Sequence, residues 1–142
     1  MKKINGNLPT TTTSSSVIDA LHRLGVKKIS MAMPYIEEVA LAAARFVEES
    51  GIGVLKKKWL GESPGYVTRD KVYSLAREVD TPESEAIFLP CTGWHTIDII
   101  EKLENDLQKP VISSNQATMW NLLRLANVND KIQGYGQLLS RY

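Results

Sequence analysis

The chain has 142 residues, of which 43% are hydrophobic and 23% are charged, which is the size and composition of one globular domain. Its 17 Lys and Arg residues nearly balance 16 Asp and Glu residues, so a net charge of +1 predicts neither a nucleic acid nor an anionic membrane as partner. A single cysteine, Cys91, excludes an internal disulfide and a cysteine-rich metal site.

The sequence predicts neither a membrane span nor a secretory signal. No apolar stretch approaches the roughly 20 residues that cross a bilayer. The N-terminal segment has a basic start without the apolar core of a signal peptide. We therefore expect a cytoplasmic protein that begins with an extension over residues 1–13.

Four short apolar segments alternate with helical patterns along the chain. The expected strands are 27–33, 53–59, 86–90 and 110–113, and the expected helices are 14–24, 36–50, 69–79, 96–107 and 116–126. The strands look apolar on both faces, which is typical of a parallel sheet covered on both sides. We expect an α/β fold: a single flavodoxin-like domain over residues 14–128, with a four-stranded parallel sheet and helices on both faces.

Both ends of this domain carry apolar residues that no expected strand uses. The chain opens with a helix, and a tail over residues 129–142 contains Ile132, Tyr135, Leu138 and Leu139. Two interpretations stay open. The ends pack on a partner, either another copy or another polypeptide, or they fold back on their own sheet.

Polar residues gather where the expected strands end. Ligands of open parallel sheets bind at the carboxyl ends of the strands. Four segments arrive there, namely 34–35, 60–66, 91–93 and 113–116. The helix that follows each turn offers free N–H donors and a positive dipole end, which suit a small molecule with a carboxylate. Ser114 and Asn115 are candidate contacts for such a ligand.

Cys91 offers the most distinctive chemistry at this edge. It follows a buried strand and precedes Gly93 and an expected helix capped by Thr92 or Thr96. A thiol at a helix N-terminus loses its proton more readily than a free thiol, so it can act as a nucleophile or proton carrier. Gly93 allows nearby amides to point at a ligand oxygen. The alternative is a buried structural cysteine, the usual state of a lone Cys.

The remaining candidates have ordinary structural explanations as well. Tyr35 either donates its hydroxyl to a carboxylate or fills the core. His95 is close to Cys91 in sequence, but neighbouring residues at a helix start point in different directions, which favours a solvent-facing His95. His22 is expected on the surface. Three tryptophans are interpreted as packing residues, since no basic residues interleave with them: Trp59, Trp94 and Trp120.

The first strand-to-helix turn lacks a glycine-rich phosphate loop. Met33, Pro34 and Tyr35 occupy that place, and proline is unsuited to a backbone wrapped closely around a pyrophosphate. A nucleotide ligand is therefore not expected. The same turn lacks the acidic cluster of a phosphoacceptor module, which argues against that class too.

Two segments resemble a known family. LPCTGWHTIDIIE over residues 89–101 and KPVISSNQATMW over residues 109–120 look like the second half of the maleate isomerase and arylmalonate decarboxylase branch of the Asp/Glu racemase superfamily. The likeness runs from about Leu8 to Gly136. Shorter segments support it, namely 10–15, 33–35 and 69–73.

The resemblance implies an enzyme that needs neither a metal nor an organic cofactor and holds a small dicarboxylate between two similar α/β domains. It implies that Cys91 is the catalytic thiol of the second domain. It also implies that Thr92 and Gly93 offer amides to a carboxylate or enolate oxygen, and that Tyr35 hydrogen-bonds the same group. The missing first domain would come from a second copy, in a homo-oligomer, or from a separately encoded polypeptide.

The loop over residues 60–66 departs from the family. In the isomerases this loop is longer and holds a carboxylate-binding Asn, whereas here it has no Asn and carries Glu62, which repels a dianion. In the family the tail packs on the first domain. Two functions therefore stand as hypotheses. One is a cysteine-based isomerase, racemase or decarboxylase that is incomplete on its own, and the other is a non-catalytic binding or interaction domain of the same fold.

Overall fold

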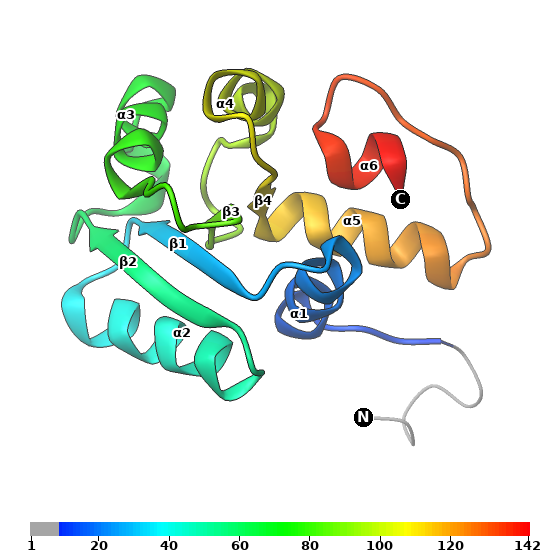
Figure 1. Ribbon diagram of the computed structural model, residues 1–142, viewed down its shortest axis with the longest axis horizontal. Coiled ribbons are helices and arrows are strands. Elements are labelled where there is room, and N and C mark those ends of the chain that lie inside the picture. The colour runs from blue at the N-terminus through cyan, green and yellow to red at the C-terminus, as the bar shows by residue number, and fades with distance from the viewer. Residues whose placement is uncertain (1–8) are drawn as a thin grey trace.

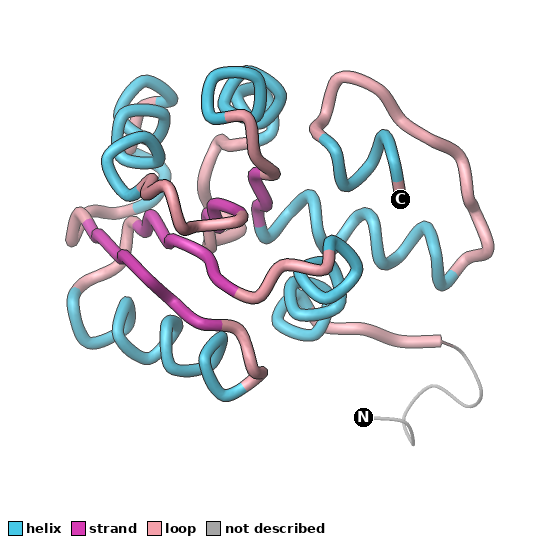
Figure 2. Tube along the Cα trace, in the orientation of Figure 1, coloured by secondary structure: helices cyan, strands magenta, loops and turns pink. Residues whose placement is uncertain are grey.

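A computed structural model of the protein describes residues 9–142 and shows a parallel sheet between two layers of helices (Figures 1 and 2). Four strands form the sheet in the order β2-β1-β3-β4: β1 (Lys28–Met33), β2 (Gly53–Trp59), β3 (Ala86–Leu89) and β4 (Val111–Ser113). The helices are α1 (Thr13–Leu24), α2 (Glu37–Glu49), α3 (Arg69–Val79), α4 (Ile100–Leu107), α5 (Ser114–Leu125) and α6 (Gln137–Arg141). All strand pairs are parallel, so the predicted α/β class is confirmed. Residues 1–8 of the expected extension, with the start of the family likeness at Leu8, lie outside the described residues.

The sheet separates two apolar clusters. Met31 and Phe88 belong to the cluster that includes residues of α1, α2 and α5, while Ala32 and Ile87 belong to the cluster with α3 and α4. Neighbouring residues of β1 and of β3 thus enter opposite clusters, as the two-residue period of a strand requires. Helices therefore cover both faces, as expected.

β2 departs from the expectation that every strand is apolar on both faces. Lys56, Lys57 and Lys58 pair with β1 in the middle of the strand, and Lys56 and Lys58 are exposed. Within residues 9–142, β2 has a strand neighbour on one side only, so its outer edge faces solvent and accommodates charge.

Side-chain caps set several helix starts. Thr12 accepts a hydrogen bond from the Ser15 amide, and α1 begins at Thr13, one residue earlier than predicted. Thr68 caps α3 by accepting from the Lys71 amide, and α3 begins at Arg69 as predicted. α5 begins at Ser114, two residues before the predicted start, because β4 continues into the helix without a loop.

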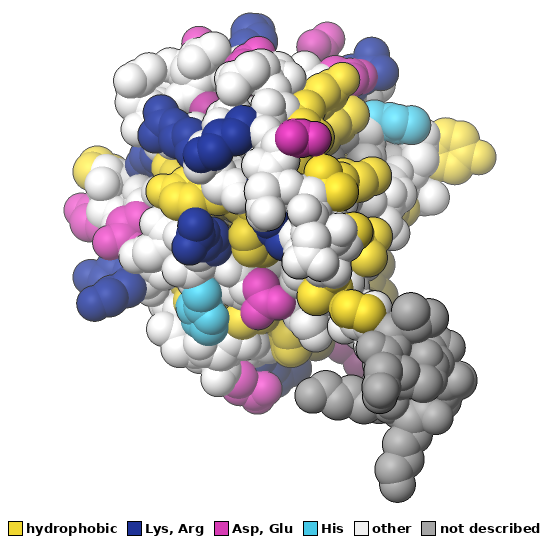
Figure 3. All heavy atoms as spheres, turned by 90° about the vertical axis from the view of Figure 1, so that its right-hand side faces the viewer, with side chains coloured by type: hydrophobic (Ala, Val, Ile, Leu, Met, Phe, Trp, Pro, Cys, Tyr) yellow, Lys and Arg dark blue, Asp and Glu magenta, His cyan; other side chains and the backbone are white. Residues whose placement is uncertain are grey.

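The tail folds back on the domain. Leu138 and Leu139 of α6 are buried in the cluster that contains α1 and α5, and Ile132 packs against the same cluster. For these residues the structure favours the second of the two interpretations left open by the sequence. Tyr135 remains 44% exposed. The side of the molecule formed by α5, α6 and the tail carries hydrophobic side chains interspersed with charges of both signs (Figure 3).

Two buried polar side chains hold this tail in place. Glu104 of α4 accepts hydrogen bonds from the Val111 amide (3.0 Å) and the Gln137 amide (2.8 Å). Gln116 of α5 donates to the Tyr135 carbonyl (2.6 Å). Burial raises the pKa of Glu104 above its usual value, although its two amide donors act in the opposite direction.

None of the helices described is both long and apolar enough to cross a bilayer.

Candidate functional site

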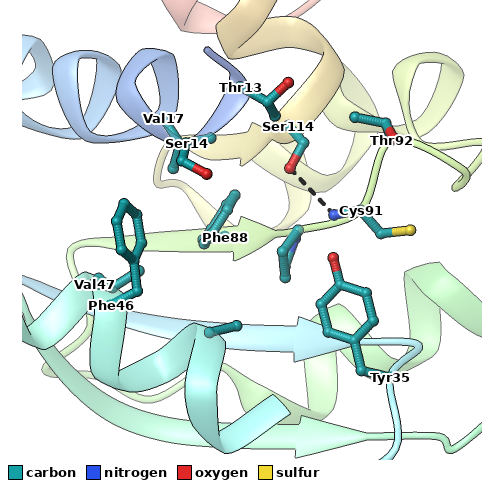
Figure 4. A pocket seen from close by; sticks show the side chains of 12 residues that line it. Thr13, Ser14, Val17, Tyr35, Phe46, Val47, Phe88, Cys91, Thr92 and Ser114 are labelled. Carbon is teal, nitrogen blue, oxygen red and sulfur yellow. Dashed lines mark hydrogen bonds between the residues drawn. The ribbon is translucent and has the colours of Figure 1, made fainter. Parts of the chain in front are cut away.

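A cavity of about 280 Å³ opens at the carboxyl edge of the sheet, between α1 and α2 (Figure 4). One part of its lining is polar: Thr13, Ser14, Tyr35, Cys91, Thr92 and Ser114. The other part is apolar: Val17, Ala43, Phe46, Val47, Phe88 and Pro90. The cavity therefore offers hydrogen-bonding groups beside a hydrocarbon wall, which is a usual composition of a small-molecule site.

Cys91 occupies a strained position at the mouth of this cavity. Its φ angle is 101°, in a region that residues other than glycine rarely adopt. Its amide donates a hydrogen bond to Ser114 Oγ (3.1 Å). The residue is half-buried and its side chain lines the cavity. The geometry therefore differs from that of a cysteine sealed in the core.

The helix after Cys91 does not begin where the sequence predicted. α4 begins only at Ile100, after a turn and a short 3-10 helix, η2 (Ile97–Ile99). Neither proposed cap serves α4, because Thr92 lies in the turn and Thr96 makes no capping hydrogen bond. The expectation that Cys91 stands at the N-terminus of α4 was wrong, because the chain after β3 forms irregular turns before it becomes helical.

The start of α5 lies beside Cys91 instead. β3 and β4 are paired up to their last residues, so the residues that follow the two strands are neighbours. Ser114 Oγ accepts from the Cys91 amide, and Asn115 Nδ2 donates to the Thr92 carbonyl (3.1 Å). Ser114 and Asn115, expected to contact a ligand, thus contact the cysteine turn, although Ser114 also lines the cavity.

The amides of Thr92 and Gly93 are uncommitted. Within the part of the chain that the structure describes, neither N–H donates a hydrogen bond. A Cβ atom at Gly93 would lie 3.3 Å from Pro64 Cβ and 3.7 Å from Cys91 Sγ, so a side chain there would crowd Pro64 and would lie in contact with the sulfur. Glycine therefore keeps the space beside the sulfur open, and the two amides remain able to bind an oxygen atom.

Tyr35 follows β1 and points its hydroxyl toward Cys91 across the cavity (Figure 4). Burial raises the pKa of the Tyr35 phenol above its usual value of 10.0, and the neighbouring Cys91 side chain raises it further. The phenol therefore stays protonated throughout the neutral range and serves as a hydrogen-bond donor next to the sulfur.

The loop between β2 and α3 is tied to the Tyr35 turn rather than inserted into the cavity. The amides of Gly61 and Glu62 donate to the carbonyls of Tyr35 (3.0 Å) and Pro34 (2.8 Å). The Glu62 side chain forms an ion pair with Lys71 and does not line the cavity. The expected repulsion between Glu62 and a dianion is therefore reduced by this pairing.

The structure separates the remaining candidates from the cavity. His95 is exposed beside Tyr66, and His22 is also exposed, as expected. Trp94 and Trp120 are buried, and Trp59 packs against the core, as packing residues do. Among residues 9–142, no group of three or more His, Cys, Asp or Glu side chains is placed to hold a metal ion.

Sequence reasoning missed the apolar wall of the cavity. The helical period places Phe46 on the buried face of α2, yet this residue is 43% exposed because α1 and α2 leave a gap over the sheet. Phe88 of β3 forms the floor of that gap. No local sequence pattern predicts this arrangement, because it depends on the distance between α1 and α2, which β1 separates in the sequence.

The fold and the site define the class: this is an open α/β domain whose small-molecule site contains a cysteine. That cysteine has a strained backbone, lies at the carboxyl edge of the sheet and has a protonated phenol beside it. The family model of arylmalonate decarboxylase matches residues 1–139 of this chain. The chain therefore belongs to the arylmalonate decarboxylase family, in agreement with the resemblance seen in its cysteine and Ser-Ser-Asn-Gln segments.

Individual relatives agree with this membership. The chain is 34% identical over 145 residues to arylmalonate decarboxylase of Bordetella bronchiseptica, covering 97% of this chain and 60% of that protein. It is 26% identical over 141 residues to maleate isomerase of Geobacillus stearothermophilus, covering 95% and 56%. A crystal structure of arylmalonate decarboxylase matches with a TM-score of 0.91 at 32% identity, over 100% of this chain and 65% of the other. The chain thus spans about 60% of the length of such relatives.

Proposed function

We propose that this chain is the cysteine-bearing part of a cofactor-independent enzyme that isomerises, racemises or decarboxylates a small dicarboxylate. The observation that carries the proposal is the accessible Cys91 sulfur, which lies beside the Tyr35 hydroxyl and the uncommitted amides of Thr92 and Gly93. Relatives named for maleate isomerisation and arylmalonate decarboxylation support the dicarboxylate class.

In the proposed chemistry, Cys91 either transfers a proton to or from the substrate or acts as a nucleophile toward carbon. A carboxylate oxygen bound by Tyr35 and the two amides is stabilised as negative charge develops on it. In a decarboxylation, a C–C bond breaks, carbon dioxide leaves, and the electron pair spreads into the bound carboxylate. Cys91 then donates its proton to carbon, and the resulting thiolate recovers a proton from water. In an isomerisation, the thiolate adds to one carbon of the C=C bond and the π electron pair moves into the bound carboxylate; after rotation about the C–C bond, the thiolate leaves and the C=C bond re-forms. In a racemisation, the thiolate removes the proton from carbon, the electron pair moves into the bound carboxylate, and a proton delivered to the opposite face by water or a partner group restores the C–H bond.

We further propose that a partner completes the cavity. Three apolar residues at the start of and along α2 are exposed, namely Ile36, Val39 and Phe46, and Phe46 also lines the cavity. The partner in this proposal is a second copy or a separately encoded domain. The lone unpaired cysteine supports a reducing, cytoplasmic location as part of the same proposal.

The cavity itself also supports a second candidate function. A domain that keeps this lining is able to bind carboxylates without turning them over. In that case the fold and the cavity persist as a binding or interaction domain. The two functions differ in turnover and not in ligand affinity.

The test is to incubate the protein with maleate, aspartate and an aryl malonate and to follow each by proton NMR in D₂O. We expect turnover of one of them, and a loss of at least about a hundredfold in Cys91→Ser. Light scattering on the same samples reports whether a second copy is present. A monomer that leaves all three compounds unchanged supports the binding domain, and equal turnover by Cys91→Ser excludes the proposed role of the thiol.

A further inference from the structure

We propose that Ser114 is the positioning residue of the reactive cysteine: its hydroxyl holds the Cys91 amide and thereby fixes the direction of the sulfur. This inference rests on the proposed function of Cys91 and assigns Ser114 a role other than that of a ligand contact. The residue acts through Cys91 and need not touch the substrate.

The backbone conformation of Cys91 requires an interaction that stabilises it. A backbone with φ of 101° relaxes unless its surroundings maintain it. The hydrogen bond from the Cys91 amide to Ser114 Oγ (3.1 Å) is the interaction that connects this peptide to the rest of the edge. Ser114 is itself buried, with 4% of its surface exposed, so water competes poorly for its hydroxyl oxygen.

Ser114 is suited to this role because its own position is fixed. It is the first residue of α5 and follows β4 directly. The preceding residue, Ser113, forms a capping box with Gln116. The Ser114 carbonyl accepts a hydrogen bond from Thr118 Oγ1 (2.7 Å). A rigid strand-to-helix junction thus presents the hydroxyl oxygen to the neighbouring, irregular turn.

A second contact from the same helix supports the first. Asn115 Nδ2 donates to the Thr92 carbonyl (3.1 Å), so the peptide group before Cys91 and the one after Thr92 are both attached to α5. Asn115 is exposed, and its bond is open to competition by water. The buried Ser114 contact therefore contributes more to the orientation of the sulfur. With both contacts made, the Thr92 and Gly93 amides are left beside the thiol.

The test compares Ser114→Thr with Ser114→Val. The two introduced side chains have nearly the same shape, but valine has a methyl group where threonine has its hydroxyl group. The readout is the rate of alkylation of Cys91 by iodoacetamide from about pH 5 to pH 9, measured by mass spectrometry on the folded full chain. We expect Ser114→Thr to stay within about threefold of the natural protein. We expect Ser114→Val to react about tenfold more slowly, because the turn relaxes and the sulfur leaves the two amides.

Equal rates and equal pH profiles for the two variants overturn the proposal. If the valine variant does not fold, Ser114→Ala replaces it, since it removes the hydroxyl without added bulk, and the same criterion applies. The readout is independent of turnover. A natural protein that is alkylated but converts no dicarboxylate argues against turnover by this chain on its own while leaving the Ser114 comparison decisive, and a Cys91 that no alkylating reagent reaches overturns both.

Discussion

Two strand-to-helix junctions meet at the carboxyl edge of this sheet, and they are built in opposite ways. β4 passes into α5 without a loop, and the capping box of Ser113 and Gln116 pairs the first backbone groups of the helix. β3 is separated from α4 by residues 90–99, which include Cys91 at positive φ. In the described part of the chain, the buried polar atoms Trp94 Nε1 and Thr96 Oγ1 of this second junction have no hydrogen-bond partner.

The contrast assigns a different task to each junction. The β4–α5 junction satisfies the local rules of helix initiation and supplies a rigid support. The β3–α4 junction breaks those rules at Cys91, the residue proposed to react with substrate. Backbone strain persists only where the surroundings determine it, and the α5 start is what surrounds Cys91.

The regular junction is weakened most by Gln116→Ala. Gln116 is fully buried, accepts from the Ser113 amide (3.4 Å) and donates to the Tyr135 carbonyl (2.6 Å). Its removal leaves both backbone groups unpaired, so we expect urea denaturation to show a loss of about 2–4 kcal/mol in the free energy of unfolding. Gln116→Glu keeps the acceptor but is expected to lose at least as much, because it loses the donor and buries a carboxylate against the Tyr135 carbonyl. A loss well below 1 kcal/mol in the alanine variant would show that the junction is not the rigid support.

The irregular junction is tested by placing glycine or alanine at Cys91. Both variants lack the thiol, but only glycine adopts a φ of 101° without steric cost. We expect Cys91→Gly to exceed Cys91→Ala by about 1 kcal/mol in the free energy of unfolding, the reverse of the usual order. An alanine variant as stable as the glycine variant would mean that the turn relaxes and stores no strain.

The link between the junctions is tested by pH. Glu104 of α4 accepts from the Val111 amide at the start of β4, and burial raises the pKa of its carboxyl group above 4.5. Because the folded state then binds this proton more tightly than the unfolded state, the contribution of Glu104 to stability is lost as the pH rises from about 4.5 through the raised pKa. The test measures the free energy of unfolding as a function of pH, from pH 4 to 7, for the natural protein and for Glu104→Gln. We expect the two curves to have different slopes. Parallel curves would contradict the raised pKa of Glu104.

The smallest effect is expected at alkaline pH. The pKa of Tyr35 is raised above 10.0, so the folded state retains this proton after the unfolded state has lost it. Stability should therefore fall as the pH rises past about 10, and more steeply in the natural protein than in Tyr35→Phe. Identical curves would show that the phenol is freely solvated and does not face the thiol.

Local patterns in the sequence predicted the elements of this fold but not the geometry of its edge. Helical periods were sufficient to place α1 and α3 to within a residue or so, because these signals lie within the elements themselves. The positive φ of Cys91 and the early start of α5 were not predictable, because both depend on the pairing of β3 with β4. Ser114 was selected for its hydroxyl, yet only the three-dimensional register shows that this hydroxyl meets a backbone amide.

The three lysines of β2 constrain how copies of this domain can assemble. Sheets commonly grow by adding a strand to an open edge, and β2 offers such an edge along its whole length. Two copies that met there would bring the lysines of one edge near those of the other, and the repulsion, which the ion pair of Lys58 with Glu78 reduces, opposes a continuous intermolecular sheet. If copies associate, this repulsion leaves the helical layers and the carboxyl edge, where the thiol lies, as the surfaces without such a penalty.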